Sequence, residues 1–155
     1  MDIKSIRKLR QILRKFDREV HFQDIQSCCK GVSFAQCHTL LEIENNNEIS
    51  VSELAKNLSL DKSTTSRTVD GLVNIGLVNR QIPKDNRRMA TISLTEQGKQ
   101  TCNNINFFND KYISGALEDF SEIELQQFLI LFEKLATNLE KMREIVNEFK
   151  DESNC

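Results

Sequence analysis

The sequence between residues 50 and 95 constrains the fold more than any other part of the chain. It contains a short helix signal over SVSELAKNLSL, a break at Asp61, a longer helix signal over KSTTSRTVDGLVNIGLV and then the segment NRQIPKDNRRMATISLT, which resembles a hairpin. Two adjacent helices followed by a two-stranded ribbon predict a winged helix-turn-helix. With helical segments near both ends of the chain, the expected fold class is mainly α with a small β-wing.

The first helix of this pair carries its own start signal. Ser50 and Glu53 have the S-x-x-E spacing of a capping box. Leu54, Ala55 and Leu58 then form an apolar stripe on a helix of barely two turns. A helix that short is not stable alone, so we expect it to pack against the helix that follows.

The second helix is expected to begin at Asp61 as its N-cap and to run to about Ile75. A period of 3.6 residues places Thr65, Val69 and Leu72 on one side, which we expect to face the core. The opposite side is polar and consists of Ser63, Ser66, Arg67 and Asn74, with Thr64 on its flank.

Short hydroxyl side chains let a helix approach base edges and phosphates closely, and an arginine can make a bidentate contact to guanine. The polar side of the second helix therefore fits a DNA major groove, although a solvated surface helix has the same pattern. Asp70 shares this side and would repel phosphate. We expect Asp70 to lie away from the DNA backbone or to bind a neighbouring arginine.

A hairpin is predicted after Gly76, with strands over Val78–Ile82 and Ala90–Leu94. The second strand alternates apolar Ala, Ile and Leu with polar Thr and Ser. Its turn is cationic, because it contains Pro83, Lys84, Asp85, Asn86, Arg87 and Arg88. A solvated hairpin is the simple alternative, but the position directly behind a candidate recognition helix favours contact with nucleic acid.

The distribution of charge agrees with this interpretation, although the net charge of the whole chain is −2. Lys56–Thr95 contains seven Lys or Arg and three Asp, which gives +4. Asp110–Cys155 contains eleven acidic and five basic residues, which gives −6. A basic segment can bind phosphate locally even in a slightly acidic protein, with an affinity that falls as salt rises.

The stretch SVSELAKNLSLDKSTTSRTVDGLVNIGLVNRQIPKDNRRMATISLTEQGK resembles the DNA-binding core of MarR-type transcriptional regulators. Its most specific elements are STTSRTVDGL, GLVNR, the wing arginines and SLTEQGK, and the flanking helices match the family's architecture. The resemblance implies that the first turns of the second helix enter the major groove and that Arg87 or Arg88 enters the minor groove. The implied DNA contacts are Lys62, Ser63, Thr64, Thr65, Ser66, Arg67, Lys84, Arg87 and Arg88.

One departure from the family pattern concerns the wing. The family usually has Asp-x-Arg a fixed distance before Leu-Thr. Counting back from Leu94 and Thr95 places Asn86 and Arg88 there, while Asp85 and Arg87 form the motif one residue earlier. Either arginine can therefore be the one that reaches DNA.

Apolar stripes near both termini predict a homodimer. The stripes have alternating spacings of three and four, and Ser121 with Glu124 supplies a capping box for the later helix. Packing within one small core is the alternative. In a two-fold dimer, two recognition helices would meet successive major grooves about 34 Å apart, and the operator would be an inverted repeat. The stripes are Ile6, Leu9, Leu13, Phe16 and Val20, and Phe128, Phe132, Leu135, Leu139, Met142, Val146 and Phe149.

The expected organisation is one chain with residues 1–30 and 100–155 forming a helical dimerisation region around a DNA-binding lobe at 33–95. The longest strongly apolar run, Phe128–Phe132, is far shorter than the roughly 20 residues that span a bilayer. Five cysteines, an odd number, without a secretion signal predict reduced thiols and a cytoplasmic location.

The segment SCCKGVSFAQCH brings three thiols near one predicted helix corner, at Cys28, Cys29 and Cys37. Ser33 and Gln36 form a capping box, so Cys37 lies near the positive end of a helix, where its thiolate is favoured. These thiols could respond to an oxidant or bind a thiophilic metal or metalloid effector such as arsenite.

Two other interpretations of Cys37 stay open. Zinc could bind through Cys37 with His38 or His21, although adjacent helical residues diverge by about 100°. Alternatively, Cys37 packs against Val32 as a hydrophobic staple. Cys102 and Cys155 are expected to be structural or incidental.

The pattern as a whole predicts a homodimeric transcriptional repressor that binds duplex DNA and requires no cofactor. A thiol-dependent redox enzyme is the first alternative, but the chain has no C-x-x-C and no glycine-rich cofactor loop. A helical protein-interaction adaptor that kept a winged domain without recognising DNA is the second, and Asp70 is the feature in its favour.

Overall fold

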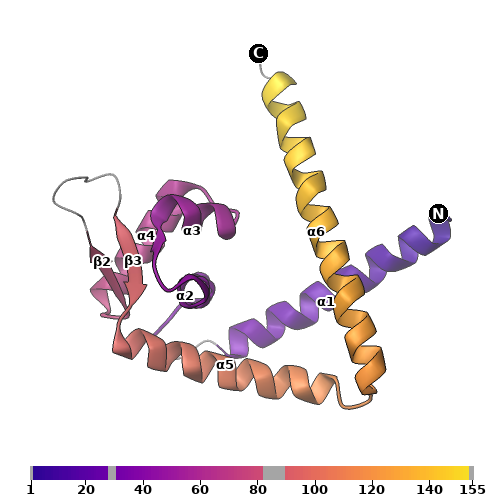
Figure 1. Cartoon of the computed structure of the whole chain (residues 1–155), viewed down its shortest axis with the longest axis horizontal. Helices are drawn as coiled ribbons and strands as arrows, with labels where there is room; N and C mark the ends of the chain where they lie inside the picture. Colours follow the sequence, from indigo (N-terminus) through magenta and orange to yellow (C-terminus); the bar gives the residue numbers. More distant parts are fainter. Residues whose placement is uncertain (1, 28–30, 82–89, 154–155) are drawn as a thin grey trace. The chain divides into compact units, whose positions relative to one another are not determined.

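The computed structural model describes residues 2–27, 31–81 and 90–153. Its fold is mainly α with a small sheet, as the sequence predicts, and Figure 1 shows the elements. The chain divides into two compact units, Met1–Tyr112 and Ile113–Cys155. In chain order the elements are α1 (Ile3–Ser27), α2 (Phe34–Asn46), β1 (Ile49–Ser50), α3 (Val51–Asn57), α4 (Lys62–Asn74), β2 (Val78–Gln81), β3 (Thr91–Leu94), α5 (Glu96–Ala116) and α6 (Glu122–Ser153).

The sheet has three antiparallel strands in the order β1-β3-β2. Val78 pairs with Leu94 across β2 and β3, which confirms the predicted hairpin strands within a residue at their described ends. The strand β1 was not predicted. It has only two residues, and Ser50 both ends this strand and caps α3, so the capping signal hid the strand.

The core of the first unit lies between α2, α3, α4 and the sheet, and α5 contributes Cys102 to it. In Figure 1 these three helices gather beside the β2–β3 hairpin. Short α3 packs on α4 and α2, as its length requires. The buried core residues are Leu40, Ile43, Ile49, Val51, Leu54, Val69, Leu72, Leu77, Val78, Ile92 and Cys102.

A glycine turn leads from α4 into β2. Gly76 has a φ of 76°, the left-handed conformation that glycine adopts without a steric cost. The amide of Leu77 donates to the carbonyl of Leu72 at 3.0 Å, and the amide of Gly76 donates to that of Val73 at 3.0 Å. These bonds satisfy the last carbonyls of the helix and fix the direction of the hairpin.

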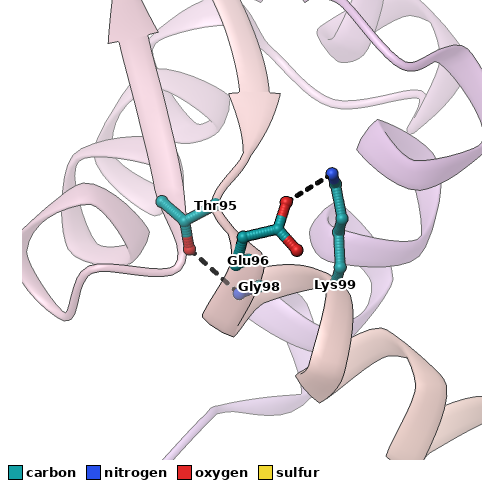
Figure 2. A network of polar contacts seen from close by, with 4 residues as sticks. All are labelled: Thr95, Glu96, Gly98 and Lys99. Atoms are coloured by element: carbon teal, nitrogen blue, oxygen red, sulfur yellow. Dashed lines mark hydrogen bonds and ion pairs between the residues drawn. The ribbon is translucent and has the colours of Figure 1, made fainter.

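Thr95 ties the start of α5 to this turn, as Figure 2 shows in part. Its hydroxyl donates to the carbonyl of Gly76 at 2.7 Å and accepts from the amide of Gly98 at 2.9 Å. Gly98 also lies against the β2 entry, because a Cβ placed there would be 2.1 Å from the carbonyl oxygen of Leu77. The SLTEQGK motif therefore has a structural reason for its threonine and its glycine.

The apolar stripes of the terminal helices are partly open to solvent in the single chain, since their residues are half-buried or exposed wherever their burial is described. On α1, Leu9 and Phe16 are exposed, and on α6, Leu139 is 54% and Met142 is 55% exposed. Ser121 caps α6, since its amide donates to the Glu124 carboxylate at 2.9 Å and its hydroxyl accepts from the Glu124 amide at 3.3 Å. Nothing within the described chain buries these stripes as a core would.

Candidate nucleic-acid interface

Two caps set the positions at which α3 and α4 begin. Both halves of the predicted Ser50–Glu53 capping box form: the Ser50 hydroxyl accepts from the Glu53 amide at 3.2 Å, and Glu53 accepts from the Ser50 amide at 3.0 Å. The hydrogen bond from the Ser50 side chain lowers the pKa of the Glu53 carboxyl. The helix pair therefore starts at the residues that the sequence predicts.

Asp61 caps α4, as predicted. Its carboxylate accepts from the Ser63 hydroxyl at 2.5 Å and from the Thr64 amide at 2.8 Å. These donors, Ser63 first, hold the pKa of Asp61 far below its usual range. A fixed negative charge thus neutralises the positive end of α4, and the hydroxyl hydrogen of Ser63 is already engaged.

The two faces of α4 are those that the 3.6-residue period predicts. Val69 and Leu72 are fully buried. Opposite them the residues are exposed, except Ser66, which is half-buried. The exposed set at the helix start is Lys62, Ser63, Thr64 and Arg67.

Thr65 requires a correction, because it was also expected among the DNA contacts. Its side chain is 0% exposed, and its hydroxyl donates to the carbonyl of Asp61 at 3.0 Å. It is a core residue, as its periodicity alone indicated, and it cannot touch a ligand without unpacking α4.

Asp70 binds a neighbouring arginine, which was one of its two expected arrangements. Its carboxylate forms an ion pair with the Arg80 guanidinium of β2 at 2.6 Å. The pair joins the outer face of α4 to the wing and offsets the charge that would repel phosphate. Both side chains are partly exposed, so such a pair contributes at most about 1 kcal/mol to stability.

Arg80 lies beside the polar face of α4 and was not among the residues predicted to contact DNA. It lines an open hollow of about 690 Å³ together with Lys62 and Ser66 of α4 and the first turn of α3. The sequence offered one indication of its position: Arg80 is in the predicted strand that follows the helix of Asp70, and Asp70 was expected to bind a neighbouring arginine. Glu48 and Glu53 line the same hollow, so its two cations lie beside two carboxylates, and Lys62 and Ser66 are the residues it shares with the polar face of α4.

The wing tip falls outside the described residues. Lys84, Arg87 and Arg88 all lie there, so their predicted contacts with DNA stay predictions.

The helices and hairpin described above also match a known protein family in sequence. Residues 32–89 match the sequence profile of the MarR family. They form a MarR-family domain.

Relatives and solved structures extend the likeness beyond this domain. The chain is 31% identical over 101 residues to the HTH-type transcriptional repressor YetL of Bacillus subtilis, a match that covers 63% of this chain and 60% of YetL. A MarR family protein from Bacillus stearothermophilus has the same fold, with a TM-score of 0.81 at 22% identity over 90% of this chain and 99% of that one. A mutant MarR from E. coli, solved in complex with operator DNA, superimposes with a TM-score of 0.69 at 22% identity, covering 87% and 99%.

Cys37 lies in the first helix, α2, of the MarR-family domain and is 3% exposed. Val32 packs against the core cluster that includes Leu40 and Ile43, and its predicted staple contact with Cys37 stays a prediction. The predicted capping box of α2 forms, since Gln36 donates its amide to the Ser33 hydroxyl at 3.3 Å and accepts from the Ser33 amide at 2.8 Å. Cys102 is fully buried, as a structural cysteine should be. Cys28, Cys29 and Cys155 lie outside the described residues.

The described residues provide no further zinc ligand beside Cys37 and the two histidines. In the part of the chain that the structure describes, no three His, Cys, Asp or Glu side chains are placed to hold a metal ion. The ring of His38 packs against Phe34 at 4.4 Å between centroids, and Phe34 contacts the ring of His21 at 5.2 Å. Both histidines thus flank an aromatic ring, whereas the Cys37 side chain is buried.

No helix among the described residues is long and apolar enough to cross a membrane.

Proposed function

We propose that the protein is a homodimeric transcriptional repressor that inserts the outer face of α4 into the major groove of an inverted-repeat operator. The observation that carries the proposal is the division of α4 into a buried face and a polar, cationic face that starts at Lys62 and includes Arg67. The MarR-family domain and the name of the relative YetL, a transcriptional repressor, support the same function.

The homodimer is part of the proposal because one chain leaves its terminal stripes uncovered. Burying apolar side chains stabilises a complex by about 25 cal/mol per Å². Leu139, Met142 and Val146 of α6 are about half exposed, as are Leu9 and Phe16 of α1. A second copy supplies the same stripes, and two-fold symmetry would then present two α4 helices to one inverted repeat.

The DNA proposal is tested by fluorescence anisotropy with fragments from the protein's own promoter region. Replacing Arg67 by Ala removes the one exposed guanidinium of α4, and a lost bidentate contact to guanine costs about 1 to 3 kcal/mol, or about 5- to 150-fold in affinity. Lys141→Ala on α6 removes an equal charge from an exposed position and is expected to leave binding unchanged. Equal affinities for wild type and Arg67→Ala would refute the role given to α4.

A second substitution separates the wing from the recognition helix. Arg88→Ala is expected to weaken binding to operator and scrambled DNA alike and to lower the slope of log affinity against log salt by about 0.9, the loss of one phosphate contact. An effect confined to the operator would contradict this assignment, and a change seen only with Arg87→Ala would move the contact to that arginine.

We also propose that a thiol-reactive signal weakens DNA binding through Cys28, Cys29 and Cys37. The support is the position of Cys37 beside Gln36, which caps α2 and lies 3.0 Å from the Cβ position of Gly71 in α4. A modification that opens the first turn of α2 would therefore disturb α4 directly. Coupling of 1 to 3 kcal/mol suffices for a 5- to 150-fold change in affinity.

The signal is tested by treating the DNA complex with arsenite or peroxide. Wild type should release its DNA, while the triple Ser variant at these three cysteines should retain it. Cys155→Ser is the matched control and should still release. Normal release by the triple variant would exclude these thiols as the sensor.

A further inference from the structure

The first half of α1 carries a dense basic face that the proposed function does not use. Residues 3–16 include six Lys or Arg and no acidic residue. Arg7, Arg10 and Arg14 are exposed and line one shallow surface hollow with Gln11. Arg18, also exposed, continues this line one turn further. We call Arg7, Arg10, Arg14 and Arg18 the arginine row.

Local stability does not explain the arginine row. Like charges three and four residues apart on a helix destabilise it by about 0.2 to 0.5 kcal/mol a pair, and cations near a helix N-terminus oppose the helix dipole. Within the described residues, no carboxylate forms an ion pair with any member of the row. Asp17 lies three residues after Arg14 and flanks the row, but one carboxylate among four arginines leaves a net positive surface that an anionic partner would stabilise.

The dimer of the proposed function leaves this row open. At 100° per residue, the row is centred about 125° around α1 from its apolar stripe, which includes Leu9, Leu13 and Phe16. On α6 the exposed Glu133, Glu140 and Glu144 lie opposite the apolar stripe. When the stripes of two helices pack together, their charged faces point apart. The acidic face of α6 therefore does not neutralise the arginine row across such an interface.

We propose that the arginine row is a second DNA contact, which binds the phosphate backbone of a duplex without sequence preference. From Arg7 to Arg18 the helix rises about 16 Å, a length along which one DNA strand presents about five phosphates. The planar guanidinium fork matches phosphate oxygens in a bidentate manner, which suits four arginines in line. The inference rests on the proposed function in one respect. The proposed dimer covers the apolar stripe of α1, and a covered stripe cannot insert into a membrane.

The test measures how the affinity of the full-length protein for a duplex of scrambled sequence depends on salt. The triple variant Arg7→Gln, Arg10→Gln and Arg14→Gln is expected to bind at least tenfold more weakly at low salt and to lower the slope of log affinity against log salt by about 2.7, for three lost phosphate contacts. The control replaces exposed Lys111, Lys134 and Lys141 by Gln, which changes the net charge equally, and should leave the slope unchanged.

Two further measurements decide the other outcomes. Arg10→Gln alone should lower the slope by about 0.9, which provides the test if the triple variant loses its helical circular dichroism. Vesicles containing phosphatidylserine should not bind; if they bind through the row while the DNA slope stays constant, the row is a membrane surface and the inference is wrong. An unchanged slope in both arginine variants overturns it as well. Arg67→Ala, measured on promoter DNA, reports separately on the proposed function.

Discussion

At the scale of single residues, the hydroxyl groups of α4 have different roles although their residue types are alike. Ser63 donates to the Asp61 carboxylate, and Thr65 donates to a backbone carbonyl from within the core. Thr68 donates to the carbonyl of Thr64 at 3.1 Å. A pattern of polar side chains on one face predicts the face. It does not predict which hydroxyls already have a partner, because that depends on caps and rotamers rather than on spacing.

Asp61→Asn tests the charge at the start of α4. The hydrogen bonds from Ser63 and Thr64 lower the folded-state pKa of Asp61 below its ordinary value near 3.8. The carboxylate therefore stabilises the fold at pH values above that value, and this contribution is lost as the pH falls toward the folded-state pKa. Asn also caps helices but does not titrate in this range. Wild type should be the more stable protein at neutral pH, and the difference should shrink below about pH 4.

The measurement is urea unfolding of both proteins across this pH range. Glu53 and Glu124 also have lowered pKa values, but they are present in both proteins and cancel in the difference. Stability curves that stay parallel down to acid pH would show that the Asp61 charge adds nothing to its cap.

At the scale of elements, the sequence predicted what is encoded locally. The capping boxes at Ser33, Ser50 and Ser121 all form, because each depends on two residues three positions apart. The strand β1 was missed because its pairing partner, β3, lies about forty residues later in the chain. Arg80 was missed for a related reason, since its value to the site comes from the approach of β2 to α4. The periodic pattern of one helix or strand contains no information about which distant segment packs against it.

Gly98→Ala tests the junction between the hairpin and α5. A methyl group there would lie 2.1 Å from the Leu77 carbonyl oxygen, so the backbone at the entry to β2 must move. The hydrogen bond from the Thr95 amide to the same carbonyl, 3.0 Å long, would be disturbed too. Overpacking of this kind costs about 1 to 3 kcal/mol in the free energy of unfolding.

Gly115→Ala is the matched control for this change. It lies near the end of the same helix and has no atom within 4 Å of the added methyl group. It should be neutral or stabilise the protein by up to about 1 kcal/mol, because alanine loses less backbone entropy than glycine on folding. Equal free energies of unfolding for the two variants would mean that the backbone at the entry to β2 moves away from the methyl group without loss of stability.

At the scale of the whole molecule, the predicted terminal stripes are present but uncovered in one chain. Their exposure favours the proposed dimer over packing within one small core, since a stripe that closed such a core would be buried. On α6, Leu139 is exposed along with Met142 and Val146, each about half accessible. Whether a second copy covers them is beyond sequence analysis, because a spacing of three and four gives the same pattern for core and for interface.

Leu139→Glu tests whether a second copy covers the stripe. A charge placed in an apolar interface must be desolvated, so the variant should run as a monomer of 17.9 kDa in light scattering, while wild type should have about twice that mass. Because dimerisation stabilises the folded chain by mass action, the Tm of wild type should rise with protein concentration, and that of Leu139→Glu should not. Thr137→Glu, on the exposed opposite side of α6, introduces the same charge and should stay dimeric. A wild-type mass of 17.9 kDa would remove the dimer, and with it the geometric reason to expect an inverted repeat.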